Sequence, residues 1–268
     1  MDYFIKRINL SERYFYQNGL YMEKQGRCEL IGREAKDVFC AFENDSVVHV
    51  IFVNQKNELV YIPKKDRKNK EYVLCELKEG FNVRNMKIAK SKDRLNLLYS
   101  ALYGDEILLI HCVLGNHARP SVIDKLESEY FFPYGDRVYY TNKSGIMGYQ
   151  ELTDGKPDRF VSVEEGAVMP YLCCIDEKEY IVYKKDTDIC VNHTPKTQDK
   201  YAFCPVLKRG KNVIELVWQC GGALKYSELD GAGNPKRIIS SKSPCLSSIQ
   251  DGENVYYDYD VNKMNNLL

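Results

Sequence analysis

The sequence predicts an all-β fold, and three observations support this prediction. Short apolar or alternating runs, separated by polar turns, recur along the whole 268-residue chain, which is the pattern of β-hairpins. Tyrosine is frequent, with 21 Tyr against 10 Phe and 1 Trp, and aromatic residues favour the pleated, half-buried surface of a sheet. The apolar periodicity of an α-helix is almost absent.

Hairpins can be assigned one after another along the chain. The first pairs residues 13–16 with 20–22 across Asn18-Gly19, a dipeptide whose residues both tolerate the positive φ of a tight hairpin turn. The others pair residues 47–53 with 59–62, 95–101 with 107–113, 138–141 with 146–152, 180–183 with 189–192, and 213–218 with 223–229. A last hairpin is expected to begin at residues 255–257.

These hairpins form a repeat. Their first strands begin near residues 13, 47, 94, 137, 179, 212 and 254, a step of roughly 40 residues, which is typical of four-stranded propeller blades. Two units also agree in sequence: YQEL at 149–152 followed by PDRFVS at 157–162 matches YSEL at 226–229 followed by PKRIIS at 235–240. The same supersecondary unit therefore occurs twice in the sequence.

With this pattern the chain resembles a β-propeller of the broad WD-repeat or sialidase-like kind. The resemblance implies a single domain, residues 1–268, made of blades with three to four antiparallel strands. We expect repeat units at approximately 1–35, 36–80, 81–128, 129–166, 167–200, 201–243 and 244–268. Seven hairpins predict seven blades, or six if the last segment joins the first to close the ring. The fifth unit is short enough to lack its outer strand.

The residues that define those two families are not found in the sequence. No unit pairs Gly-His with Trp-Asp, and the only tryptophan, Trp218, is followed by Gln219. The turns DGKP at 154–157 and DGAG at 230–233 lack the remainder of the sialidase sequence Ser-x-Asp-x-Gly-x-Thr-Trp. The resemblance therefore concerns architecture, and no family activity follows from it.

Charge and composition argue against nucleic acid and membrane partners. Lys plus Arg and Asp plus Glu both total 38, so no net field attracts polyanions. The basic run at residues 64–70 is typical of a solvated loop. The sequence shows neither a secretory signal nor a long apolar segment, so we expect a cytoplasmic protein with ten reduced, mostly strand-buried cysteines.

No pattern in the sequence predicts a catalytic residue, a metal site or a cofactor. The four histidines, at positions 49, 111, 117 and 193, have no metal-ligand spacing, and the cysteines form no C-x-x-C. A G-x-S-x-G nucleophile turn is absent, and the glycine pairs lie between strands rather than before a helix. These observations favour a protein that is not an enzyme.

The leading hypothesis is a non-enzymatic scaffold that binds a protein or peptide partner through loops on one face. In a propeller the loops between the second and third strands of the blades share one face. The residues expected to gather there are Asn54, Gln55, Tyr103, Asn142, Lys143, Asp186 and Cys220. All of them except Cys220 are predicted to contact the partner.

Two alternatives stay open. One is a propeller that binds a small carbohydrate or hydrolyses glycosides with a pair of carboxyl groups, and a pocket with two facing acidic side chains would favour it. The acidic residues near 164, 176, 186 and 251–260 are more simply explained as turn residues. The other alternative is an amino-terminal assembly domain of a longer protein, suggested by the incomplete last unit. The sequence does not predict an oligomeric state.

Overall fold

The computed structural model describes residues 5–9, 12–64, 70–92, 94–115, 119–153, 156–209, 213–220, 223–251 and 254–259. Within these ranges the secondary structure consists of β-strands, and no helix is long and apolar enough to span a membrane. Most of the basic run, residues 65–69, lies outside the described residues. The chain divides into two compact units: residues 1–129, 135–138 and 150–160 form the first, and residues 130–134, 139–149 and 161–268 the second.

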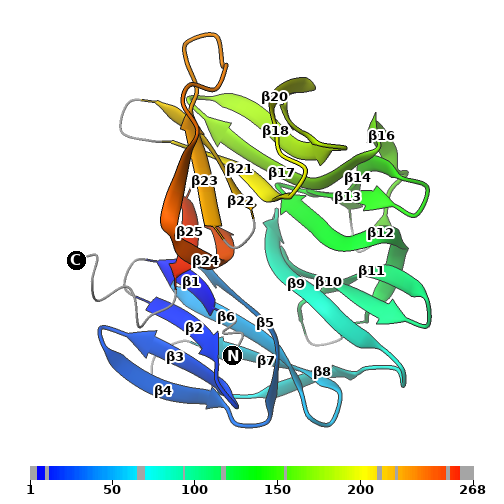
Figure 1. Ribbon diagram of the computed structural model, residues 1–268. Coiled ribbons are helices and arrows are strands. Elements are labelled where there is room, and N and C mark those ends of the chain that lie inside the picture. The colour runs from blue at the N-terminus through cyan, green and yellow to red at the C-terminus, as the bar shows by residue number, and fades with distance from the viewer. Residues whose placement is uncertain are drawn as a thin grey trace. The chain divides into compact units, whose positions relative to one another are not determined.

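The first unit begins with two four-stranded antiparallel sheets, in which each strand pairs with the next strand of the chain (Figure 1). The first sheet consists of β1 (Ile5–Asn9), β2 (Glu12–Tyr16), β3 (Leu20–Lys24) and β4 (Arg27–Gly32). The second consists of β5 (Ala35–Asn44), β6 (Val47–Asn54), β7 (Glu58–Lys64) and β8 (Tyr72–Glu76).

The next eight strands belong to one sheet. They are β9 (Asn82–Ser91), β10 (Arg94–Tyr103), β11 (Glu106–Val113), β12 (Ser121–Tyr134), β13 (Arg137–Asn142), β14 (Ile146–Thr153), β15 (Lys156–Pro157) and β16 (Val161–Glu165). The fourth of them is long and has the preceding strand as one neighbour and the following strand as the other. The first part of β12 pairs with β11, and β13 is its other neighbour. Both β15 and β16 pair with β14.

Two more antiparallel sheets complete the second unit, and Figure 1 shows β21 beside β17 and β18. One sheet consists of β17 (Ala167–Ile175), β18 (Lys178–Lys185), β19 (Asp188–Val191) and β20 (Thr194–Gln198). The other consists of β21 (Ala202–Arg209), β22 (Ile214–Cys220), β23 (Ala223–Glu228), β24 (Ile239–Asp251) and β25 (Asn254–Tyr259). Like β12, β24 pairs with one neighbour first and with the other later.

The hairpins predicted from the sequence are confirmed. They correspond to the neighbouring strands β2–β3, β6–β7, β10–β11, β13–β14, β18–β19 and β22–β23. At the first turn both Asn18 and Gly19 have positive φ, 52° and 149°. The last expected hairpin is corrected: residues 255–257 lie in β25, which pairs back onto β24 and therefore ends a hairpin instead of beginning one.

The fifth repeat unit corrects one expectation, because its outer strand is present. β20 pairs with β19 through register partners that run from Asp188–Gln198 to Val191–Thr194. The strand includes Pro195, although proline removes a backbone donor from the ladder. Proline is tolerated on an edge strand, and β20 lies at the edge of its sheet among the described strands.

The two sequence copies adopt the same strand register. The first copy pairs Tyr149 with Val161 and Leu152 with Pro157, and the second pairs Tyr226 with Ile239 and Leu229 with Pro235. These partners occupy equivalent positions in the matched sequences. The similarity seen in the sequence is therefore a similarity of structure.

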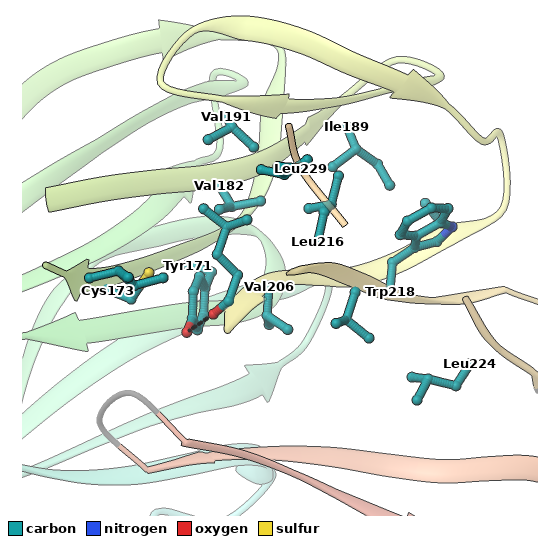
Figure 2. Packing of buried hydrophobic residues seen from close by; sticks show 14 residues of the cluster. Tyr171, Cys173, Val182, Ile189, Val191, Val206, Leu216, Trp218, Leu224 and Leu229 are labelled. Atoms are coloured by element: carbon teal, nitrogen blue, oxygen red, sulfur yellow. Dashed lines mark hydrogen bonds between the residues drawn. The ribbon is translucent and has the colours of Figure 1, made fainter. Parts of the chain in front are cut away.

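Apolar side chains of β17–β19 and β21–β23 form the core of the second unit (Figure 2). Trp218 is 1% exposed within it, and the Tyr171 hydroxyl donates a hydrogen bond to the Leu207 carbonyl at 2.8 Å. In the first unit, one cluster surrounds Tyr14 and Phe52, and another surrounds residues of β9–β11. This burial supplies the main driving force for packing neighbouring sheets.

A buried carboxylate anchors the start of β21 to β22 and β23. Asp199 accepts hydrogen bonds from Trp218 Nε1 and Lys225 Nζ, both at 2.8 Å, and Cys220 Sγ lies 3.4 Å from its other oxygen. Burial alone would raise the pKa of Asp199, but the hydrogen bonds from Lys225, Trp218 and Cys220 outweigh it and lower the pKa to about 2. The carboxylate is therefore ionised at neutral pH.

The cysteines described by the structure are free thiols. Cys40 and Cys112 are buried in one cluster of the first unit, and Cys75 packs against them. Burial raises the pKa of Cys112 to about 12 and also raises the pKa of Cys75. These thiols are therefore protonated and poorly nucleophilic.

Candidate functional site

The predicted contact residues Asn54 and Gln55 lie in the loop between β6 and β7. Asn54 is 6% exposed, and its Oδ1 accepts hydrogen bonds from the backbone amides of Lys56 at 3.0 Å and Glu58 at 2.9 Å. Such Asn side chains replace backbone groups in closing a turn. Asn54 therefore shapes the loop, whereas Gln55 is exposed on it.

Tyr103 lies at the same end of the first unit. Its ring meets Phe81 edge-on, with centroids 4.9 Å apart, and Lys78 Nζ lies 4.5 Å from the ring centroid. The amide of Leu77 donates to the carbonyl of Asn57 at 2.8 Å, which ties this segment to the loop of Asn54. The structure therefore brings three of the predicted residues to one end of this unit.

The remaining predicted residues belong to the second unit. Asn142 repeats the geometry of Asn54, because its Oδ1 accepts from the amides of Ser144 at 3.0 Å and Ile146 at 3.1 Å. Lys143 follows in this loop, and Asp186 lies with φ 52° in the exposed turn between β18 and β19. Contact of any of these residues with a partner stays a prediction.

A cleft of about 820 Å³ lies at the other end of β18, where Lys178 begins the strand. This volume is within the range of ligand sites in proteins. The cleft is formed by the turns between β17 and β18, β19 and β20, and β21 and β22, together with the segment after β23. All of its lining residues belong to the second unit.

One wall of the cleft follows from the alternation of side chains in strands. Lys178 and Tyr180, two positions apart, line it from the start of β18, and Thr194 and Lys196 line it from β20. Asp176 lines it from the turn before β18. Successive side chains of a strand point to opposite faces, so every second residue faces the same side. The edge strand β20, which was not expected from the sequence, therefore forms part of this wall.

The facing wall is the turn at residues 230–233. Asp230 Oδ1 accepts hydrogen bonds from the amides of Ala232 at 2.9 Å and Asn234 at 2.8 Å, which is again the geometry of Asn54. Gly233 has φ 76°, and a Cβ placed there would lie 3.7 Å from Lys196 Nζ. The turn and β20 thus approach each other across the cleft.

The apolar floor of the cleft is the surface of the core. Val191 and Leu229 line the cleft and also belong to the buried cluster, where they are 4% and 7% exposed (Figure 2). Tyr180 and Ile214 line it as well and pack against the same cluster. Because the floor is continuous with a packed interior, it is expected to be rigid.

Both carboxylates that line the cleft are already engaged. Asp176 forms an ion pair with Arg209, and Asp230 closes its own turn. A glycosidase requires two carboxyl groups that face each other across the sugar. Each of the two carboxylates in the cleft instead has a partner within the protein.

Basic side chains outnumber acidic ones in the lining. The lining contains two carboxylates and four basic residues, Lys178, Lys196, Arg209 and Lys236. Lys236 forms an exposed ion pair with Glu228 at 3.2 Å. In the part of the chain that the structure describes, neither Lys178 nor Lys196 has an ion-pair partner. The cleft is therefore cationic.

A second polar cluster surrounds Glu164. Lys185 pairs with this carboxylate, His193 Nδ1 lies 3.1 Å from it, and the Tyr183 hydroxyl donates to it at 3.4 Å. Hydrogen bonds from Lys185 and then His193 lower the pKa of Glu164, whereas a catalytic acid needs a raised pKa. Among the described residues, no group of three or more His, Cys, Asp or Glu side chains is placed to hold a metal ion.

The cleft was not predicted from the sequence. The predicted contact residues of the second unit lie in loops at one end of its strands, whereas the cleft lies at the other end. The available signals were the alternation of Lys178 with Tyr180 and of Thr194 with Lys196, and the turn DGAG at 230–233. These residues are far apart in the sequence, and only the assembled strands show that they line one cleft.

No known family model and no curated protein sequence matches the chain. Solved structures are similar in fold. A mutant of the Aleuria aurantia lectin in complex with alpha-methyl-L-fucoside is 12% identical, with a TM-score of 0.50 over 90% of this chain and 94% of the lectin. The Dos1 propeller is 10% identical, with a TM-score of 0.56 over 91% of this chain and 71% of that one. The WD40 domain of SCAP from fission yeast is 11% identical, with a TM-score of 0.54 over 94% and 77%.

These similarities show the fold and nothing finer, because all the identities are low. The protein is an all-β propeller, as predicted, and its sheets are consistent with six to seven blades. The neighbours include a lectin in complex with a fucoside and a WD40 domain, so the fold alone does not choose between carbohydrate and protein partners.

Proposed function

We propose that this protein is a non-enzymatic binding module whose second unit holds a segment of a partner protein in the cleft. The observation that carries the proposal is the combination of a rigid apolar floor, made by Val191 and Leu229, with polar walls on both sides. A peptide segment can bury an apolar side chain on such a floor and place polar groups against the walls. A partner protein presents such segments in its loops and termini.

A peptide fits this cleft better than a sugar does. Asp230 Oδ1 already accepts hydrogen bonds from two backbone amides, so this oxygen is not available to sugar hydroxyls. Tyr180 is half-buried and packs against the core, which leaves little of its ring as a stacking platform. The predicted loop residues, above all exposed Gln55 and Tyr103, are proposed as a further contact surface on the first unit.

The proposal is tested by offering the immobilised chain a random peptide display library and, in parallel, a glycan array. Gly231→Trp adds a bulky ring to the lining of the cleft, and a Cβ added at Gly231 meets no atom within 4 Å, so we expect the turn to tolerate it. Urea unfolding of the variant confirms that the fold is kept. Gly115→Trp is the matched control, since Gly115 has equally open surroundings and lies outside the cleft.

The expected result is a family of peptides that bind the original chain and Gly115→Trp but not Gly231→Trp. Glycans that bind in a Gly231-dependent way, without such peptides, would overturn the proposal in favour of a lectin. Peptides that bind all three proteins equally would also overturn it, because the cleft would then play no part.

A further inference from the structure

We propose that the cleft selects acidic segments, in which Asp or Glu side chains flank an apolar residue. This inference rests on the proposed function, because it assumes that a peptide occupies the cleft. It adds the chemical character of the peptide, and it names Lys178 and Lys196 as the residues that bind the acidic side chains.

The charge of the cleft is not balanced by its own residues. In the described part of the chain, Lys178 and Lys196 have no ion-pair partner, and Lys178 is exposed. Each ammonium group has three donors and can form charge-assisted hydrogen bonds to a carboxylate. An acidic side chain in the cleft would supply the missing acceptor.

The two other basic residues of the lining, Arg209 and Lys236, form only exposed ion pairs. Arg209 and Asp176 are 57% and 56% exposed, and Lys236 and Glu228 are 51% and 48% exposed. Ion pairs this exposed contribute little to stability, because water screens them. Arg209 has five N–H donors, so it can bind an incoming carboxylate while it keeps Asp176.

The positive charge is local to this cleft. The whole chain carries 38 basic and 38 acidic residues, so its net charge gives no general attraction for polyanions. Selection must then come from short-range contacts in the cleft. The apolar floor of Val191 and Leu229 adds a requirement for an apolar side chain, which a nucleic acid or an inorganic anion does not meet.

The inference is tested by fluorescence anisotropy with two short labelled peptides. One has several Glu residues flanking a Leu, and the other has Gln in place of each Glu. The full chain is compared with Lys178→Gln/Lys196→Gln. The matched control is Lys70→Gln/Lys92→Gln, which removes the same charge from two exposed lysines of the first unit. Urea unfolding of both variants confirms that the fold is kept.

We expect the Glu peptide to bind about tenfold more tightly than the Gln peptide, because hydrogen bonds to charged groups are the stronger ones. The cleft variant should lose most of that difference, and the control variant should retain it. Affinity for the Glu peptide should also fall as salt is raised.

The possible failures separate this inference from the proposed function. Equal binding of both peptides, blocked by Gly231→Trp, would overturn acidic selection and leave the peptide-binding function intact. Failure of the display library to yield any peptide sensitive to Gly231→Trp would remove both. A preference for Glu that survives in Lys178→Gln/Lys196→Gln would overturn the assignment of these two lysines.

Discussion

The two copies of the duplicated segment share their backbone and differ in the side chains that the backbone presents. In the first copy the amide of Asp158 donates to the carbonyl of Glu151 at 3.2 Å, and in the second the amide of Lys236 donates to Glu228 at 2.8 Å. Strand register is repeated as well. Yet Asp158 is acidic where Lys236, which lines the cleft, is basic.

A second difference concerns the anchoring of the hairpin. Gly148 in the first copy pairs with Ser162, and Lys225 in the second pairs with Ser240. Only the second position carries a side chain, and Lys225 uses it to reach Asp199. The comparison shows that buried and turn positions fix the unit, whereas its surface positions are free to take on separate roles.

The largest expected effect concerns the buried leucine that the two copies share. Leu152 and Leu229 are 6% and 7% exposed, so Leu152→Ala and Leu229→Ala should each lower the free energy of unfolding by about 2 to 4 kcal/mol. Urea unfolding measures both. Val161→Ala is the control and should cost much less, because Val161 is 43% exposed. If only one leucine mattered, the two copies would not be energetically equivalent.

A smaller effect concerns the anchor present in the second copy. Asp199→Asn should lower the free energy of unfolding at neutral pH by about 2 kcal/mol, because the lowered pKa of Asp199 reflects stabilisation of its ionised form. That stabilisation exists above the unfolded-state pKa near 4 and is lost as the pH falls toward about 2.

The difference between the original chain and Asp199→Asn should therefore narrow across this acidic range. Urea unfolding of both proteins at several pH values measures it. A difference that is the same at every pH would show that the charge of Asp199 does not stabilise the fold.

The smallest expected effect on stability concerns the surface charges that differ between the two copies. Asp158→Lys and Lys236→Asp exchange the charges of two exposed positions, so each should change the free energy of unfolding by less than about 0.5 kcal/mol. Lys236→Asp should weaken binding of the Glu peptide several-fold, since it adds a carboxylate to the cleft. Asp158→Lys should leave that binding unchanged, and equal effects of both substitutions would refute a role for the cleft.

The sequence predicted the hairpins because their turns and alternating strands are local features. Asn18-Gly19 and the loop after Asn142 both specify their own geometry within a few residues. The outer strand β20 was not expected because the fifth unit is short. Its Pro195 is tolerated because β20 lies at an edge, which only the assembled sheet reveals.

The candidate site was less predictable than the fold. It combines residues from Asp176 to Lys236, which come together only when β17–β20 and β21–β23 pack side by side. The sequence could suggest loops as contact sites, but it could not show that the Asn54 and Asn142 side chains are consumed by their own turns.

A crystal structure of the full chain with a peptide enriched from the display library would locate the binding site directly. We expect the peptide to lie between β20 and the turn at residues 230–233, with an apolar side chain on Leu229 and a carboxylate in hydrogen-bond contact with Lys178 or Lys196. A peptide bound elsewhere on the molecule, with the cleft empty, would refute the cleft as the binding site.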